Sequence, residues 1–353
     1  MVSYKVIGLM SGTSLDGLDI AACEFLQEGN NWKYKIHDAR TFPYSTEWLN
    51  RLSQLHLSDA FTFARTNTEY GHLLGTIARA FLLDTGFEAQ LIASHGHTIF
   101  HQPDKGLTFQ IGSGSAIAAE TGLPVVCDFR SLDVALGGQG APLVPLGDRM
   151  LFGDYDVCLN LGGFANISME SGENRIAFDI CPANFVLNRL ASRIGLPYDP
   201  EGRIAGEGTV DPVLLDKLNH LDYYTAPYPK SLGREWVEFN IFPLLTGSEA
   251  NISFLLRTYC EHIAMQINHS IEGHESLSIL VTGGGARNKF LLERIRQLGT
   301  HRWIVPEEIL LDFKEAMIFA FLGLLRSLGK ANILHTVTGS TIDQCGGALY
   351  QPF

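Results

Sequence analysis

Near its start the chain reads Val6-Ile7-Gly8-Leu9-Met10-Ser11-Gly12-Thr13-Ser14-Leu15-Asp16-Gly17-Leu18-Asp19-Ile20-Ala21. An apolar run enters a turn of small and hydroxylated residues and a second apolar run leaves it, which predicts a β-hairpin. The tip offers many backbone N–H groups and hydroxyls with almost no bulk, so it suits an anion, above all a phosphate. It lacks the lysine of a Walker A loop, and its flanks predict strand–turn–strand rather than strand–turn–helix. An ordinary Gly-rich hairpin is the alternative interpretation, because Gly and Ser fill most tight turns.

Bulk composition excludes several classes of partner. The 353 residues, 46% hydrophobic and 18% charged, indicate a folded globular protein of about two to three domains. A net charge of −12 argues against nucleic acid and anionic membranes. The six cysteines form no C-x-x-C pair, which favours free thiols in a reducing cytosol. The N-terminus does not read as a signal peptide, and the longest apolar run, 316–325, is too short to span a membrane, so we expect a cytoplasmic protein.

Hydrophobic periodicity predicts two similarly built halves. Residues 4–10, 19–25 and 33–41 read as a strand meander, followed by helices over 46–56 and 60–85 and then by alternating strands and helices. A second unit begins near residue 155 and repeats the pattern of the first predicted hairpin, with a strand, a Gly-rich turn over 162–166 and another strand. We expect an α/β fold with two domains, 1–150 and 151–335, an insertion near 197–243, and a C-terminal segment, 336–353, that returns to the first domain.

Two further glycine segments are candidate phosphate loops. Asn160-Leu-Gly-Gly-Phe-Ala-Asn166 repeats the hairpin design, and Thr282-Gly283-Gly284-Gly285-Ala286-Arg287-Asn288 follows a buried strand and opens a helix. Tight turns for close packing are the alternative in both cases. Asp179 ends an apolar strand before Pro182, a good position for a general base, although a helix cap is also compatible.

A cluster of histidines suggests a different kind of site. His95-Gly96-His97 at a strand end, with His101 nearby and Asp128 at the next strand end, is compatible with a metallohydrolase site. A substrate-facing histidine pair, continued by Thr98, is the interpretation we favour.

Charged residues near glycine-rich loops complete the candidates. Arg130 and Asp133 precede Gly137-Gly138-Gln139-Gly140 in a predicted linker and suit a sugar or a carboxylate, or a surface salt bridge. Lys230 and Arg234 could close on a bound anion or simply be exposed. Glu315, at a predicted helix start, either interacts favourably with the helix dipole or is a ligand to a metal ion or a water molecule.

Taken together, these motifs resemble those of the anhydro-N-acetylmuramic acid kinases, a branch of the sugar kinase/Hsp70/actin superfamily. The resemblance runs from about Val6 to Gly347 and is carried by the stretches 8–19, 128–145, 160–168, 229–235 and 282–288. It implies two RNase-H-like domains with mixed sheets flanked by helices and a nucleotide cleft between them, ATP with Mg²⁺, and a homodimer. It implies conversion of 1,6-anhydro-N-acetylmuramic acid, ATP and water into N-acetylmuramic acid 6-phosphate and ADP, a step of peptidoglycan recycling.

The resemblance also implies residue roles. Asp179 matches the general base, and His95, His97, Thr98, Arg130, Asp133 and Glu315 are candidates for the amino-sugar. ATP and its phosphates are expected at Gly12, Thr13, Ser14, Leu15, Asp16, Gly17, Leu18, Asp19, Gly162, Gly163, Asn166, Gly283, Gly284, Gly285 and Asn288. No resident metal ligands are expected, and Mg²⁺ is expected to arrive with ATP.

Two stretches depart from the family pattern. The family usually reads Asp-Thr-Gly-Pro-Gly-Asn where this chain has Asp179-Ile180-Cys181-Pro182-Ala183-Asn184, and His-Gly-Gln-Thr where it has His95-Gly96-His97-Thr98. Ile180 and Ala183 add side chains where backbone could approach a ligand. A divergent nucleotide- or sugar-binding protein with weak or no activity is therefore the second hypothesis, and the metal-dependent hydrolase is the third.

Overall fold

The computed structural model describes residues 1–12, 15–246 and 251–352. The chain forms two compact units, unit 1 with residues 1–153 and 313–353, and unit 2 with residues 154–312. The break after residue 153 lies close to the expected boundary at 150. Residues 313–335, expected in the second domain, belong to unit 1 together with the C-terminal segment.

Unit 1 contains a seven-stranded mixed sheet in the order β12-β6-β4-β1-β2-β3, with β5 paired to β4. Strands β1, β2 and β3 form the antiparallel meander, while β4 and β6 run parallel to β1. The strands are β1 (Val2–Ser11), β2 (Leu18–Glu28), β3 (Asn31–Phe42), β4 (Leu91–Gln102), β5 (Leu107–Ile111), β6 (Val125–Cys127) and β12 (Ala348–Tyr350).

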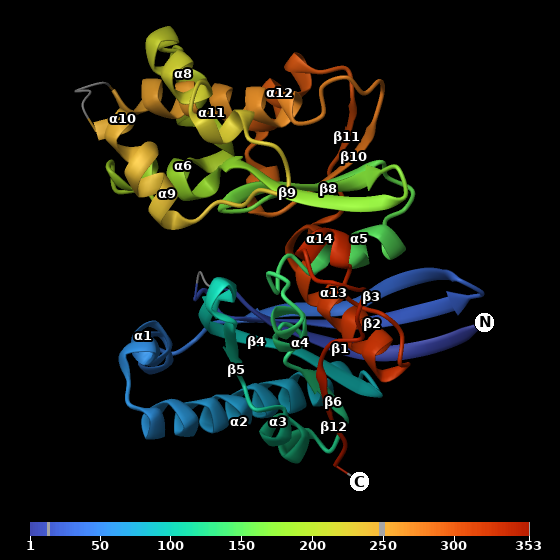
Figure 1. Ribbon diagram of the computed structural model, residues 1–353. Helices are drawn as coiled ribbons and strands as arrows, with labels where there is room; N and C mark the ends of the chain where they lie inside the picture. The colour runs from blue at the N-terminus through green and yellow to red at the C-terminus, as the bar shows by residue number, and fades with distance from the viewer. Residues whose placement is uncertain (13–14, 247–250, 353) are drawn as a thin grey trace. The chain divides into compact units, whose positions relative to one another are not determined.

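Helices cover both faces of this sheet (Figure 1). Ile7, Leu9 and Ile20 pack on Tyr70 and Leu74 of α2 (Ala60–Thr85), and α3 (Gly114–Thr121) pairs with α2 on that face. On the opposite face lies α13 (Glu308–Ser327), which begins in unit 2 and continues through unit 1. The remaining helices of the unit are α1 (Thr46–Gln54), α4 (Ser131–Ala135), α5 (Val144–Leu151) and α14 (His335–Thr338), with one-turn 3₁₀ helices η1 (Leu55–Leu57) and η2 (Pro103–Lys105). Helix α4 covers residues 131–135 of the segment in which the sequence predicts a linker, so that part of the prediction was wrong.

Gly8 sets the distance between β1 and α13. A Cβ atom at this position would lie 1.9 Å from the carbonyl oxygen of Ala316. About two helix turns further along, Gly323 lies against Ala93 of β4, where a Cβ on the glycine would be 2.4 Å from the Ala93 Cβ. The helix therefore lies close to the sheet at two strands.

Unit 2 repeats the strand arrangement of unit 1. Its five-stranded sheet has the order β11-β10-β7-β8-β9, with β7, β8 and β9 antiparallel and β10 and β11 parallel to β7. In both sheets three meander strands are followed by two parallel strands, in the order 3-2-1-4-5 along each unit. This arrangement confirms the expected fold class. The strands are β7 (Val157–Leu161), β8 (Phe164–Ser171), β9 (Asn174–Pro182), β10 (Ser278–Thr282) and β11 (Arg302–Ile304).

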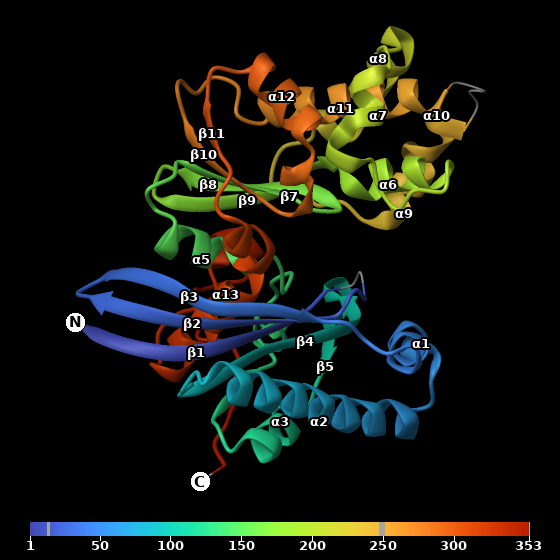
Figure 2. The same ribbon diagram turned by 180° about the vertical axis from the view of Figure 1, so that it is seen from behind.

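Figure 2 shows α6, α11 and α12 over the same face of the unit 2 sheet. Their apolar sides, with Leu187, Leu256 and Leu291 among them, share one core with the strands. The segment expected as an insertion, 197–243, consists largely of short helices. The helices of this unit are α6 (Asn184–Ser192), η3 (Pro200–Gly202), α7 (Arg203–Glu207), α8 (Pro212–Asn219), η4 (Asp222–Thr225), α9 (Arg234–Asn240), α10 (Phe242–Thr246), α11 (Ile252–His269), η5 (Gly284–Arg287) and α12 (Lys289–Leu298).

All six cysteines are free thiols. Among the described residues, no helix has the length and apolarity needed to cross a membrane.

We expect Gly8→Ala to destabilise unit 1, because the new methyl group meets backbone atoms that no rotamer change can move. The expected loss in free energy of unfolding is about 2–3 kcal/mol, measured by urea denaturation. Gly153→Ala is the matched control, since its Cβ would meet only the Arg149 carbonyl at an ordinary 3.4 Å. Equal stability of the two variants would contradict the close approach.

Candidate functional site

The opening hairpin forms as the sequence predicts, with Met10 of β1 opposite Asp19 of β2. Of its tip, Thr13 and Ser14 lie outside the described residues. Leu15 has φ 63°, a left-handed conformation that is strained for a branched-chain residue and that often marks functional turns. Asp16 is exposed at the tip, whereas Asp19 accepts a hydrogen bond from Thr41 Oγ1 at 2.5 Å.

A buried polar chain lies beneath this hairpin. Ser11 Oγ is 3.0 Å from His97 Nδ1 and accepts from Tyr44 OH at 2.7 Å, and Tyr44 OH is 2.5 Å from Tyr70 OH. All four side chains are buried. Burial lowers the pKa of His97 to about 4, so the ring is neutral at physiological pH. Sequence reasoning found His97 but missed Tyr44 and Tyr70, which lie on other elements and show no local motif.

His95 and Arg130 form a second buried pair. The Arg130 Nε and Nη2 atoms donate to His95 Nε2 at 3.0 and 2.8 Å, and His95 Nδ1 donates to the Gly96 carbonyl at 2.9 Å. Because the guanidinium can only donate and the carbonyl can only accept, the imidazole carries its proton on Nδ1. Burial, reinforced by the neighbouring Arg130 charge, lowers the pKa of His95 well below its ordinary value.

This arrangement contradicts the metallohydrolase hypothesis. Both ring nitrogens of His95 are engaged in hydrogen bonds, and Asp128 accepts from Ser131 Oγ at 2.5 Å. Within the described residues, no group of three or more His, Cys, Asp or Glu side chains is placed to hold a metal ion.

Asp133 stabilises a loop instead of presenting a carboxylate to a ligand. It is 0% exposed, and its oxygens accept from Gly140 N at 2.6 Å, from Thr338 Oγ1 at 2.7 Å, and from Gln344 Nε2. Gly140 in turn accepts from Arg130 Nη1 at 2.6 Å. The predicted hydrogen bond from Asp133 to the sugar is therefore wrong. Asp133 instead binds the Gly140 N–H, and the carbonyl of the same glycine accepts from Arg130.

Glu315 is exposed on α13 and supplies a negative charge near Arg130. Burial lowers the pKa of Arg130, while Glu315 and Asp133 oppose that shift. Thr98 is half-buried beside His97 on β4. In unit 1 the structure thus brings together His95, Arg130 and Glu315, three of the predicted sugar ligands.

The two glycine segments of unit 2 lie side by side. A Cβ at Gly283, which has φ 84°, would lie 2.4 Å from Asn160 Oδ1, and one at Gly285 would lie 2.8 Å from the Leu161 Cβ. Gly162 and Gly163 form the turn between β7 and β8 next to Asn160. The structure therefore supports one continuous backbone surface from the two predicted phosphate loops, with Gly284 open around its Cβ position.

Two predicted loop residues have other placements. Asn288 caps α12, where its side chain accepts from Leu291 N at 2.9 Å. Asn166 lies within β8, where it pairs with Asn160 on one side and Asp179 on the other. Since cross-strand neighbours lie side by side, a polar row crosses the sheet through Thr282, Asn160, Asn166 and Asp179.

Asp179 ends this row on the edge strand β9. Its Oδ2 accepts from Leu232 N at 2.9 Å, and its backbone N–H donates to the Lys230 carbonyl at 3.2 Å. Burial raises the pKa of the Asp179 carboxyl above its ordinary value, and the Leu232 hydrogen bond opposes this shift. A partly desolvated carboxylate of this kind suits proton transfer.

The residues after Asp179 that depart from the family pattern face the protein interior. Cys181 and Ala183 are 0% exposed and Ile180 is 3% exposed, and all three belong to the hydrophobic core of unit 2. Their added bulk therefore fills the core. Asn184, which keeps the family residue, donates to the Leu161 carbonyl at 3.1 Å and so connects β7 to the start of α6.

Comparison with known proteins shows the family of this chain. The family model of anhydro-N-acetylmuramic acid kinase matches residues 4–352. The chain belongs to this family. It is 36% identical to the anhydro-N-acetylmuramic acid kinase of Vibrio cholerae serotype O1, over 98% of both chains, and 35% identical to that of Azorhizobium caulinodans, over 99% of both. Among solved structures, the activator of 2-hydroxyisocaproyl-CoA dehydratase from Clostridium difficile, with bound ADPNP, matches with a TM-score of 0.46 at 12% identity, over 90% of this chain and 94% of that chain.

Buried neutral His97 makes the stability of unit 1 sensitive to acid. The unfolded chain takes up a proton near pH 6.5, whereas the folded ring resists it down to about pH 4. Stability is therefore lost as the pH falls through this window, by about 2 kcal/mol between pH 7 and 5. We expect His97→Gln to remove this share of the pH dependence, measured by urea unfolding at both pH values.

His56→Gln, at an exposed site of the same unit, is the control and is expected to keep the wild-type pH dependence. An unchanged slope in His97→Gln would contradict the neutral buried ring.

Proposed function

We propose that the protein is an ATP-dependent kinase that opens the 1,6-anhydro bond of anhydro-N-acetylmuramic acid and phosphorylates O6. Membership of the family supports the substrate class. The observation that carries the chemistry is Asp179, a partly desolvated carboxylate on an edge strand, with Oδ2 bound to the Leu232 N–H. The product, N-acetylmuramic acid 6-phosphate, would return a cell-wall sugar to metabolism, a step of peptidoglycan recycling.

The reaction requires water, a base and a phosphoryl acceptor. Asp179 takes a proton from water as the water oxygen bonds to C1, and the bond from C1 to the bridging oxygen breaks. That oxygen, now O6, attacks the γ-phosphorus of ATP, and ADP leaves with the electron pair of the broken P–O bond. The sugar gains the elements of water and one phosphoryl group.

Backbone N–H groups would neutralise much of the phosphate charge. We propose Gly12 at the hairpin tip of unit 1 and, within unit 2, the glycine segments at Gly162 and Gly283–Gly285 as candidate sources of these groups. Mg²⁺ arrives with ATP as part of the substrate, and it is usually held by phosphate oxygens plus one or two carboxylates. The exposed Asp16 carboxylate fits that requirement.

For the sugar, we propose Arg130, Glu315, His97 and Thr98 as contacts, with His95 fixing the Arg130 guanidinium. A neutral imidazole and a guanidinium present hydrogen-bond donors to the hydroxyl, amide and carboxylate oxygens of an amino-sugar acid. We further propose a homodimer that works in the cytoplasm, where ATP is supplied. Light scattering after size exclusion tests the dimer.

We expect Asp179→Asn to lower kcat by about 10²- to 10⁴-fold, because the amide cannot accept the water proton. ATP affinity, measured by calorimetry, should stay near the wild-type value. The assay follows ADP release with and without 1,6-anhydro-N-acetylmuramic acid. Asp104→Asn, at an exposed site in unit 1, is the charge-matched control and should keep wild-type turnover.

Near-full activity of Asp179→Asn would remove Asp179 as the base. Binding of nucleotide by the wild-type protein with no sugar-dependent ADP release would instead favour the second hypothesis, a nucleotide- or sugar-binding protein without turnover.

A further inference from the structure

Residues 221–232, here called the strap, cover the edge strand β9 at Asp179. The strap makes three hydrogen bonds to this one residue. Its Leu232 N–H donates to Asp179 Oδ2 at 2.9 Å, its Tyr223 hydroxyl donates to the Asp179 carbonyl at 2.6 Å, and its Lys230 carbonyl accepts from the Asp179 N–H at 3.2 Å. Side chain and backbone of Asp179 are thus both fixed by the same segment.

Lys230 closes the strap on itself. Its Nζ atom donates to the Tyr223 carbonyl at 3.1 Å and to the Tyr224 carbonyl at 3.4 Å, and it lies 4.7 Å from the Tyr223 ring centre. The sequence predicts a cation that closes on a bound anion or is simply exposed. The structure instead gives the ammonium group two carbonyl acceptors and the Tyr223 ring within the strap, and it also lies 5.9 Å from the centre of the Phe178 ring on β9.

The strap is anchored to helix α11 through a buried histidine. Tyr224 OH donates to His262 Nε2 at 2.9 Å, and His262 Nδ1 donates to Asn219 Oδ1 at 2.6 Å. Burial lowers the pKa of His262 to about 3, so this link stays neutral and intact over the physiological pH range. The Tyr224 end of the strap is therefore fixed independently of Lys230.

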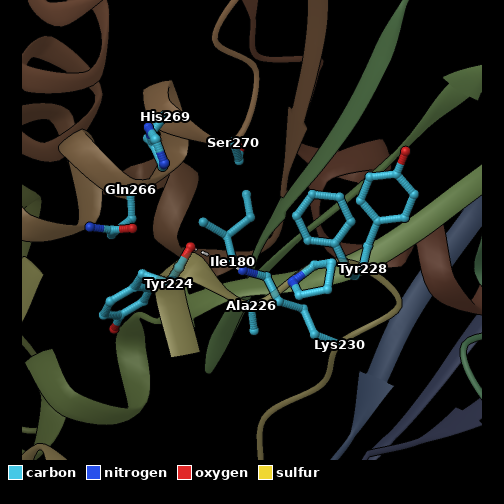
Figure 3. A pocket seen from close by; sticks show the side chains of 10 residues that line it. Ile180, Tyr224, Ala226, Tyr228, Lys230, Gln266, His269 and Ser270 are labelled. Carbon is cyan, nitrogen blue, oxygen red and sulfur yellow. Dashed lines mark hydrogen bonds between the residues drawn. The ribbon is translucent and has the colours of Figure 1, made fainter. Parts of the chain in front are cut away.

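A pocket of about 150 Å³ lies next to the strap (Figure 3). Tyr224, Ala226, Tyr228 and Lys230 from the strap line it together with Ile180 of β9, and residues near the end of α11 complete the wall. Because this volume is not filled by side chains, the 226–230 part of the strap has room to shift if the Lys230 hydrogen bonds are lost.

We propose that the strap is the positioning element of the catalytic carboxylate, with Lys230 and Tyr223 as positioning residues and Oδ1 of Asp179 as the oxygen that receives the water proton. This inference rests on the proposed function. Oδ2 is occupied by the Leu232 N–H, whereas Oδ1 accepts no hydrogen bond within the described residues. A fixed carboxylate with one uncommitted oxygen holds the base in a single orientation toward water.

The neighbouring ionisable groups do not change charge over the acidic pH range in which the Asp179 carboxyl does. Burial raises the pKa of the Tyr223 hydroxyl and of the Cys181 thiol above their ordinary values, and the negative charge of Asp179 adds to both shifts. Desolvation lowers the pKa of Lys230 from its ordinary value, and Asn166 on the adjacent strand is uncharged. The acidic limb of the pH–rate profile should therefore report the ionisation of the Asp179 carboxyl.

Lys230→Met and Tyr223→Phe test the proposal. Each keeps the size of the side chain and removes a strap hydrogen bond, so we expect kcat to fall about tenfold to a hundredfold with KM for ATP nearly unchanged. The acidic limb should move to higher pH as the Leu232 N–H contact loosens. Lys230→Arg should recover part of the loss. Because Tyr223→Phe changes no charge, any shift of the acidic limb in this variant reports a change in the geometry around Asp179.

Matched controls carry the same substitutions elsewhere. Lys217→Met changes an exposed lysine on α8, and Tyr198→Phe changes an exposed tyrosine of unit 2 outside the strap. Both are expected to retain wild-type kcat and pH profile. Circular dichroism confirms that each variant is folded.

A second readout separates this inference from the proposed function. The protein labelled with ¹³C at aspartate carboxyls is titrated without substrate, and the Asp179 signal is identified by its loss in Asp179→Asn. A raised midpoint in both strap variants supports positioning even if the wild-type protein releases no ADP with the anhydro-sugar. An Asp179 midpoint equal to wild type in both variants overturns the proposal, whatever happens to kcat.

Discussion

The contact of β1 with α13 at Gly8 is the constraint on which unit 1 depends. Because the Ala316 carbonyl occupies the space of a missing Cβ, the helix lies against the sheet at backbone distance. The same helix carries Glu315 and Phe319, and the centres of the Phe319 and His95 rings are 4.6 Å apart. One backbone contact therefore fixes the separation between the opening hairpin and the helix whose Phe319 packs on His95.

A buried histidine that stays neutral near pH 7 fixes neighbouring groups in each unit. In unit 1, His95 accepts from Arg130 and its own pKa is well below its ordinary value, so the guanidinium is held in one orientation. In unit 2, His262 bonds to Tyr224 and Asn219 in the same neutral state. Such partners fix geometry without adding a charge of their own.

The fold and the turns of the candidate site could be predicted from the sequence, because their signals are local. The two hairpins and the glycine turns each depend on a few neighbouring residues. The sequence prediction that the strand ends at Asp179 was wrong, because β9 continues to Pro182. For Asp133 and Lys230 the sequence leaves a ligand contact or an exposed position open, because charges next to glycines look available in sequence. Their actual partners, Thr338 and Gln344 for Asp133 and the strap carbonyls for Lys230, depend on packing. Tyr44 and Tyr223 were missed for the same reason.

The departures after Asp179 take a different meaning once the packing is known. In sequence, Ile180, Cys181 and Ala183 suggest a changed ligand surface, because larger residues replace a hydroxyl and two glycines. In the structure these side chains are part of the unit 2 core, where a change of volume is accommodated by neighbouring apolar groups. The surroundings of the Asp179 carboxylate come from elsewhere in the chain, chiefly from the strap at Leu232 and Tyr223. The segment that contacts this carboxylate is therefore about 50 residues away in sequence from the carboxylate itself.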